Sequence, residues 1–151
     1  MGSAEIDVVN DNLLDMSNAV GGTAGGISCT INENGSYKFS GTATEVGINV
    51  WFLGGYNNEK TIFSIEPGTY YINGVFLFNK HSAVANASVG RIFTFTETQY
   101  VTGVRAINAA IGKTYNETIY PIIALSDKTV EWVQHQSQTA IMPIQQEMLT
   151  G

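Results

Sequence analysis

The chain has 151 residues, which is the size of one domain large enough to bury a hydrophobic core. Only 13% of the residues are charged, and 13 acidic against 7 basic residues give a net charge of −6, which argues against a nucleic-acid partner. No apolar run reaches the roughly 18 residues that suggest a membrane-spanning helix, so no membrane partner is expected. The single cysteine, Cys29, excludes an intramolecular disulfide and is expected to be a small core residue.

The N-terminal part is predicted to be a leader followed by loops. Residues 1–11 are polar and acidic, begin with Met-Gly-Ser, which is typical of a cloning remnant, and are expected to precede the folded domain. Leu13-Leu14 is the first apolar anchor. The glycine-rich segment Asn18–Gly26 lacks the spacing of a phosphate-binding loop and predicts an ordinary connection.

A β-hairpin is predicted next. Its strands are Ile27–Ile31 and Ser36–Thr44, and the second alternates with Tyr37 and Phe39 on the inner face. Between the strands, Asn34-Gly35 is typical of a type I′ turn, in which both central residues take a positive φ.

Two further elements carry clear alternation. Gly47–Leu53 is predicted to be a strand with Ile48, Val50 and Phe52 inward, which leaves Asn49 and Trp51 on the opposite face. Thr61–Gly74 is predicted to form two strands that meet at a corner, because proline fixes the φ that a turn needs and the following glycine accepts a positive one.

The second half of the chain gives weaker signals. Val75–Phe78 is too uniformly apolar to assign its faces, and His81–Val89 is small and polar, which favours a loop with a little edge structure. Strands are predicted at Arg91–Thr96, with Phe93 and Phe95 inward, at Tyr100–Ile107, with Arg105 outward, and at Thr118–Leu125, where Pro121 requires a bulge or an edge.

The C-terminal part changes character. Residues 126–151 are rich in glutamine and lack the earlier turn signals, so they are expected to be a connector to a following domain, held to the body at its start by Trp132. Eight or nine short strands separated by turns over residues 12–125 predict an all-β fold, an antiparallel β-sandwich of the jelly-roll kind.

The order of several short motifs resembles a known family. They are N-L-L, N-x-N-G-S-Y-x-x-S-G-T-A-T, I-x-P-G-T-Y, F-T-x-T-E, an arginine between apolar residues, and I-Y-P-I, at Asn12–Leu14, Asn32–Thr44, Ile65–Tyr70, Phe93–Glu97, Val104–Ala106 and Ile119–Ile122. This set resembles the carbohydrate-binding-module-like jelly rolls of phage and prophage tail or baseplate proteins of Gram-positive hosts.

The resemblance implies a function and a location. It implies a non-catalytic module on the virion tail that adsorbs to host cell-wall polysaccharide, with other domains of the tail protein as further partners. The alternative is a structural decoration or assembly module of the tail with no affinity for sugars.

A candidate saccharide site follows from the outward side chains. Aromatic rings that pack on the apolar face of a sugar, with amide and guanidinium donors beside them, suit carbohydrate binding. The candidate residues are Asn49, Trp51, Tyr71, Asn73, Arg105 and Tyr120. Two alternatives remain open, that Trp51 is covered by the leader or the tail, and that Arg105 pairs with Glu97 or Glu117.

Metal binding and catalysis have less support in the sequence. Oxygen donors at Asn32–Asn34 and at Asp11 or Asp15 suit a structural calcium ion, but the loop spacing of a calcium site is absent. His81 and His135 lie too far apart in the sequence to suggest zinc. Scattered glutamates and the lack of a nucleophile motif favour a protein that is not an enzyme.

Overall fold

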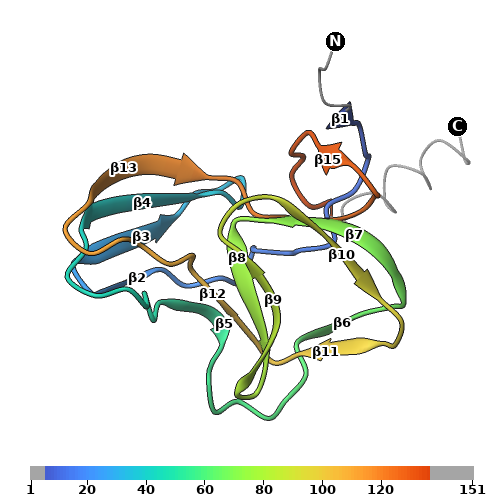
Figure 1. Cartoon of the computed structure of the whole chain (residues 1–151), viewed down its shortest axis with the longest axis horizontal. Coiled ribbons are helices and arrows are strands. Elements are labelled where there is room, and N and C mark those ends of the chain that lie inside the picture. The colour runs from blue at the N-terminus through green and yellow to red at the C-terminus, as the bar shows by residue number, and fades with distance from the viewer. Residues whose placement is uncertain (1–5, 137–151) are drawn as a thin grey trace, which may run out of the picture.

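The computed structural model describes residues 6–136 and consists of short β-strands, nearly all antiparallel, joined by turns and loops (Figure 1). No helix occurs within these residues, and therefore none that is long and apolar enough to cross a membrane. The all-β class predicted from the short alternating segments is confirmed.

Two sheets are joined through one stretch of chain. The first has the order β13-β4-β3-β2 and the second the order β10-β7-β14. Their strands are β2 (Gly22–Ala24), β3 (Ile27–Ile31), β4 (Tyr37–Thr42), β7 (Gly68–Asn73), β10 (Arg91–Phe95), β13 (Thr114–Ile119) and β14 (Ile122–Leu125). Because β13 pairs with β4 while β14 pairs with β7, the chain passes from one sheet to the other at Tyr120-Pro121.

The remaining strands form a four-stranded sheet, β5-β12-β8-β9, and two strand pairs, β11-β6 and β1-β15. Their bounds are β1 (Ile6–Asp7), β5 (Trp51–Gly54), β6 (Phe63–Ile65), β8 (Val75–Asn79), β9 (Ser82–Ala87), β11 (Gln99–Val101), β12 (Gly103–Arg105) and β15 (Thr129–Val130). The β1-β15 pair is the one parallel ladder among these strands, and it brings the two ends of the described chain together (Figure 1).

Two strands predicted as single elements are each divided in two. Thr118–Leu125 is interrupted at Pro121, whose missing N–H cannot contribute to a ladder. Tyr100–Ile107 is interrupted at Thr102, whose N–H donates to the carbonyl oxygen of Phe78 at 2.8 Å. At each interruption the chain changes its partner strand, so neither segment stays on one sheet.

The segment His81–Val89, predicted to be a loop with a little edge structure, contains a full strand at the edge of a sheet. The segment contains β9, which forms a hairpin with β8 through Lys80, whose φ is +52°. Ala85 and Ala87 are buried against the core, and their small side chains gave no apolar alternation strong enough to indicate a strand.

The predicted hairpin of β3 and β4 is present, but its turn is of another type. Gly35 has a φ of +92°, whereas Asn34 does not take a positive φ. Asn32 accepts a hydrogen bond from the Gly35 N–H at 3.0 Å and donates one to the carbonyl oxygen of Ser36 at 2.8 Å. This is the three-residue loop in which a left-handed glycine follows a type I turn.

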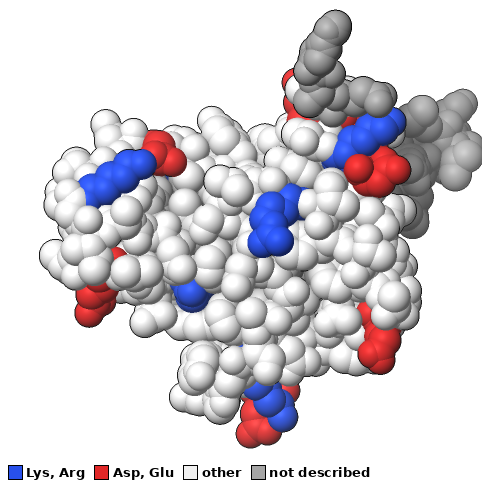
Figure 2. Space-filling view, viewed as in Figure 1, with Lys and Arg blue, Asp and Glu red and all other residues white. Residues whose placement is uncertain are grey.

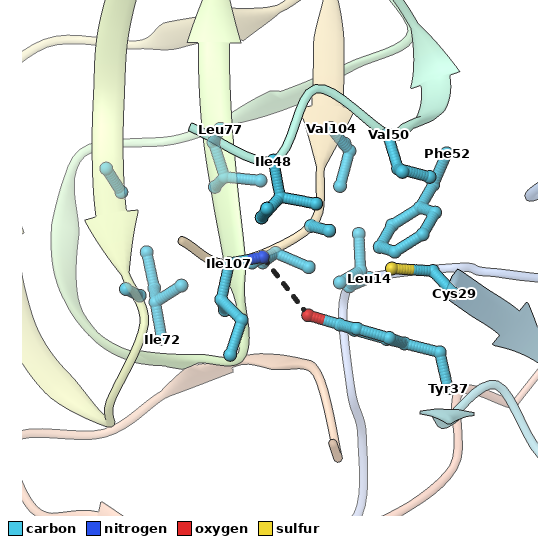
Figure 3. Packing of buried hydrophobic residues seen from close by; sticks show 14 of the residues in the cluster. Leu14, Cys29, Tyr37, Ile48, Val50, Phe52, Ile72, Leu77, Val104 and Ile107 are labelled. Carbon is cyan, nitrogen blue, oxygen red and sulfur yellow. Dashed lines mark hydrogen bonds between the residues drawn. The ribbon is translucent and has the colours of Figure 1, made fainter. Parts of the chain in front are cut away.

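The inner faces of the sheets share one core (Figure 3). It receives Tyr37 from β4, Phe52 from β5, Ile72 from β7 and Leu77 from β8, each at most 2% exposed. The Tyr37 hydroxyl donates to the carbonyl oxygen of Gly74 at 2.7 Å and accepts from the Ile107 N–H at 3.3 Å, and burial raises its pKa. Cys29 lies in the same cluster as predicted, and burial raises the pKa of its thiol to about 12.

A smaller cluster joins both ends of the described chain to the β14 strand. Ile122, Ala124 and Val130 are buried together, with Trp132 and other partly buried side chains packed against them. The buried Asn12 side chain connects the same segments, because its Oδ1 accepts from the N–H groups of Leu14 and Ile123 and its Nδ2 donates to the carbonyl oxygens of Pro121 and Val133.

The division of the chain at residue 125 stays a prediction. Residues 126–136 contact the body of the domain, and Trp132 Nε1 donates to the carbonyl oxygen of Pro121 at 2.9 Å. The rest of the expected connector, residues 137–151, and the first five residues of the expected leader lie outside the described residues.

Candidate functional site

The outer face of the β5-β12-β8-β9 sheet brings an aromatic residue beside a cation. Arg105 is the register partner of Trp51 on one side and of Phe76 on the other. Since Val104 points into the core, its neighbour Arg105 lies on the opposite, outer face. The structure therefore places two of the predicted site residues next to each other.

Arg105 is held rigidly on this face. Its Cζ lies 4.4 Å from the ring centroid of Phe76 and 5.5 Å from that of Phe78. Its Nη1 donates to the carbonyl oxygens of Ile48 at 3.3 Å and Ala106 at 3.0 Å, and to Asn108 Oδ1 at 3.0 Å. Burial lowers the pKa of the guanidinium, while Tyr37 raises it, and a group with this reference value stays charged at neutral pH.

The other two nitrogens of Arg105 are free to bind a ligand. Within residues 6–136, all the hydrogen bonds of this side chain leave from Nη1. No side-chain nitrogen or oxygen among those residues is both buried and without a partner. The residue is only 8% exposed, so Nε and Nη2, which have no hydrogen-bond partner among residues 6–136, each keep a small solvent-accessible area.

Trp51 supplies a partly exposed ring next to this cation. The ring lies over Gly103, where any Cβ would come within 2.7 Å of Trp51 Cζ3. Its centroid is 5.2 Å from that of Phe78, edge to face, and 6.5 Å from that of Tyr56. A shallow hollow of about 350 Å³ is lined by Asn49, Trp51 and Tyr56.

A loop beside the hollow adds a second aromatic pair. The Tyr56 and His81 rings stack with centroids 4.3 Å apart, and His81 Nε2 lies 2.9 Å from Asn57 Oδ1. Tyr56 remains 49% exposed, so its ring can meet a ligand without a change of fold. Charged side chains are sparse and scattered on the molecular face seen in Figure 2.

The structure does not place all six predicted residues on one sheet. Tyr71 and Asn73 lie on β7, which pairs with β10 and β14 and not with β5 or β12. Tyr71 packs on the cluster at the chain ends, and Asn73 Nδ2 donates to the carbonyl oxygen of Tyr120 at 2.9 Å. The Tyr120 ring lies 5.2 Å from that of Trp132. The alternation of apolar and polar residues distinguishes the two faces of a strand, but it does not predict which sheet the strand joins.

Residues 6–136 bear on the alternatives for Trp51 and Arg105, while the rest of the leader and tail lies outside the described residues. Arg105 has no ion pair with Glu97 or Glu117, and it is buried where an exposed side chain was expected. Val9, Trp132 and Val133, from the leader and the tail, pack on the cluster around Ile122 instead of on Trp51.

Several site residues were missed by sequence reasoning. Phe76 and Phe78 alternate with Val75 and Leu77, so a period of two was present in a segment judged too apolar to assign. Gly103 within a strand pattern also indicates a close approach by another group, which here is the Trp51 ring. No pattern in the sequence indicates that Asn108 orients Arg105.

The calcium ligands considered from the sequence line a different cavity. Asp15 and Asn32–Asn34 contribute to a hollow of about 240 Å³ together with Trp132 and His135. Hydrogen bonds from the side chain and then the N–H of Ser17 hold the pKa of the Asp15 carboxyl below its usual value. Asp15 Oδ2 is 3.7 Å from His135 Nε2. Asn34 Oδ1 accepts from the Ser36 N–H and hydroxyl.

Asp15 Oδ1 and Asn34 Oδ1 each already accept a hydrogen bond within the protein. Among the described residues there is no group of three or more His, Cys, Asp or Glu side chains that could hold a metal ion.

Comparison with protein-family models, with curated proteins and with solved structures finds no match to this chain. Functional inference therefore depends on the chemistry of the site. That chemistry consists of a partly exposed indole ring, a tyrosine ring, amide groups, and two free guanidinium N–H donors in a fixed position.

Proposed function

We propose that the protein is a non-catalytic carbohydrate-binding module that adsorbs to bacterial cell-wall polysaccharide through the face carrying Trp51 and Arg105. The observation that supports it is the exposed part of the Trp51 ring beside the solvent-open Nε and Nη2 of Arg105. A pyranose packs its C–H face on an aromatic ring and turns its hydroxyls toward hydrogen-bond donors at the edge.

We further propose a jelly-roll arrangement for the strands. Its support comes from two continuous stretches of chain that each serve two sheets, β11 into β12 and β13 into β14, around one shared core. The Pro67-Gly68 corner likewise connects β6 to β7 in another sheet. Strands that change sheets around a common core are typical of double-sheet sandwiches.

The biological setting is proposed from the family resemblance, which places such modules in the tail or baseplate of phages of Gram-positive bacteria. In that setting the module lies on the virion tail at the host surface, beside other domains of the tail protein.

The test is adsorption of a fluorescently labelled domain to Gram-positive cells, with purified wall polysaccharide as competitor. Labelling of the cell surface that the polysaccharide competes away is the expected result. Labelling of no host tested, together with no binding to isolated wall polysaccharide, contradicts the proposal.

A second candidate is a structural or assembly module without sugar affinity. It is favoured by large apolar side chains that remain exposed on or beside the β10-β7-β14 sheet, namely Ile92 at 43%, Tyr120 at 45% and Leu125 at 66%. Apolar exposure of this kind suits contact with another tail protein. In the adsorption test this candidate predicts no labelling of cells.

A further inference from the structure

We infer that the saccharide bound at this face carries an anionic group, a carboxylate or a phosphate, which Arg105 binds through Nε and Nη2. This inference rests on the proposed function and specifies the chemical class of its ligand. It depends on the charge balance around Arg105 and on the geometry of its free donors.

Arg105 is a buried cation without an anionic partner. The ion pairs that the structure gives for residues 6–136 join Lys80 to Glu59 and His135 to Asp15, and none involves Arg105. Its hydrogen bonds go to two carbonyl oxygens and one amide oxygen, all of them neutral. The guanidinium thus meets only neutral acceptors and two aromatic rings. Burying a charge is costly unless the charge is paired, so we infer that its anionic partner arrives with the ligand.

The free edge of the guanidinium has the right geometry for an oxyanion. The Nε and Nη2 N–H groups lie on the same side of the planar group and can donate two parallel hydrogen bonds to a carboxylate or phosphate. Nη1 is fixed by Ile48, Ala106 and Asn108, and the rings of Phe76 and Phe78 lie against the plane. The fork is therefore oriented before the ligand binds, which reduces the entropy lost on binding.

The surroundings add no competing negative charge. The side chains placed around Arg105 are Trp51, Phe76, Phe78 and Asn108, all uncharged, and Asn49 and Tyr56 line the adjoining hollow. No carboxylate is among the groups that shift its pKa. In a chain of net charge −6, this face is therefore locally suited to an anion.

The test uses wall polysaccharide purified from cells that the labelled domain adsorbs to, in three forms. One is untreated, one has its carboxyl groups reduced to alcohols, and one has its phosphodiesters cleaved with hydrofluoric acid. Titration calorimetry with the wild-type domain should show about tenfold or greater loss of affinity for one treated form, the scale of a charge-assisted hydrogen-bond pair. The form that loses affinity identifies whether the anion is a carboxylate or a phosphate.

Two substitutions connect the effect to Arg105. Arg105→Gln should bind the untreated polysaccharide about tenfold or more weakly, close to the affinity of the wild type for the affected treated form. The control, Arg91→Gln, removes the other arginine, which is exposed on β10, and should leave every affinity unchanged. Arg105→Gln also loses structural hydrogen bonds, so its melting temperature is measured, and if it fails to fold the three-form comparison on the wild type decides alone.

The outcomes separate the two proposals. Equal affinity of the wild type for all three forms overturns the anionic ligand and leaves a neutral saccharide module. An untreated polysaccharide that does not bind at all overturns the proposed function, and the inference with it.

Discussion

Trp51 is the residue whose exposed surface the proposed site needs most. Its ring lies over Gly103 and outside the buried core cluster, and the residue remains partly exposed. Trp51→Ala should therefore weaken polysaccharide binding by about 1–3 kcal/mol, the scale of losing an aromatic anchor. Its cost in stability should stay well below the roughly 3–5 kcal/mol of a fully buried aromatic residue.

The matched control is Tyr120→Ala, which removes an exposed aromatic ring that lies beside Trp132, in the connection between β13 and β14. Affinity and melting temperature are measured on both variants. A large fall in melting temperature with unchanged affinity in Trp51→Ala would show that this ring is structural, and equal losses of affinity in both variants would place the site elsewhere.

Asn12 is the residue on which the chain ends depend. Its side chain makes four hydrogen bonds while only 2% exposed, to backbone groups of Leu14, Pro121, Ile123 and Val133. Asn12→Ala leaves these groups without that partner, so unfolding by urea should show a loss of about 2–4 kcal/mol. The exposed Asn10 is the control, and Asn10→Ala should change stability by less than about 0.5 kcal/mol.

At the scale of elements, strand pairing decides which predicted residues meet. The β3-β4 hairpin was predictable because its alternation and its Asn-Gly turn are local signals. Arg105 and Trp51 were predicted on an outer face, and the pairing of β5 with β12 makes them neighbours. Tyr71 and Asn73 were also assigned to an outer face. Their strand, β7, pairs with β14, which is distant in the sequence, and no local sequence pattern predicts that pairing.

The end of β5 gives a direct test of this pairing. Gly54 has a φ of +60°, and a Cβ there would collide with the backbone carbonyl oxygen of Thr102 beside β12. Gly54→Ala should therefore cost more than the roughly 1–3 kcal/mol of a strained backbone alone. Its neighbour Gly55 has open space around it, so Gly55→Ala should stay within about 0.5 kcal/mol of the wild type. Similar urea midpoints for both variants would contradict the observed β5-β12 register.

At the scale of the whole molecule, the two parts of the C-terminal segment, before and after Gln136, are expected to contribute differently to stability. Deleting Gln136–Gly151 should leave the melting temperature within a few degrees, because the contacts of Val130, Trp132 and Val133 remain. Deleting residues 126–151 removes those contacts and uncovers Ile122 and Ala124. The free energy of unfolding should fall by a few kcal/mol. At about 2–4 °C per kcal/mol, the melting temperature should then fall by on the order of 5–10 °C.

Calorimetric scans of the two truncated proteins check this expectation. A collapse of the shorter deletion would mean that residues after Gln136 are an integral part of the fold. Equal melting temperatures for both would mean that the cluster around Ile122 adds little to stability.

The central claim is that polysaccharide binds at the face carrying Trp51. The chain has two tryptophans, one in that face and one, Trp132, whose Nε1 donates to Pro121 at the other end of the fold. Labelling the indole nitrogens with ¹⁵N gives two signals, which Trp51→Phe assigns. During titration with purified wall polysaccharide the Trp51 signal should shift and saturate while the Trp132 signal stays in place. A shift of Trp132 alone, or of neither signal while binding is observed by calorimetry, would contradict the account.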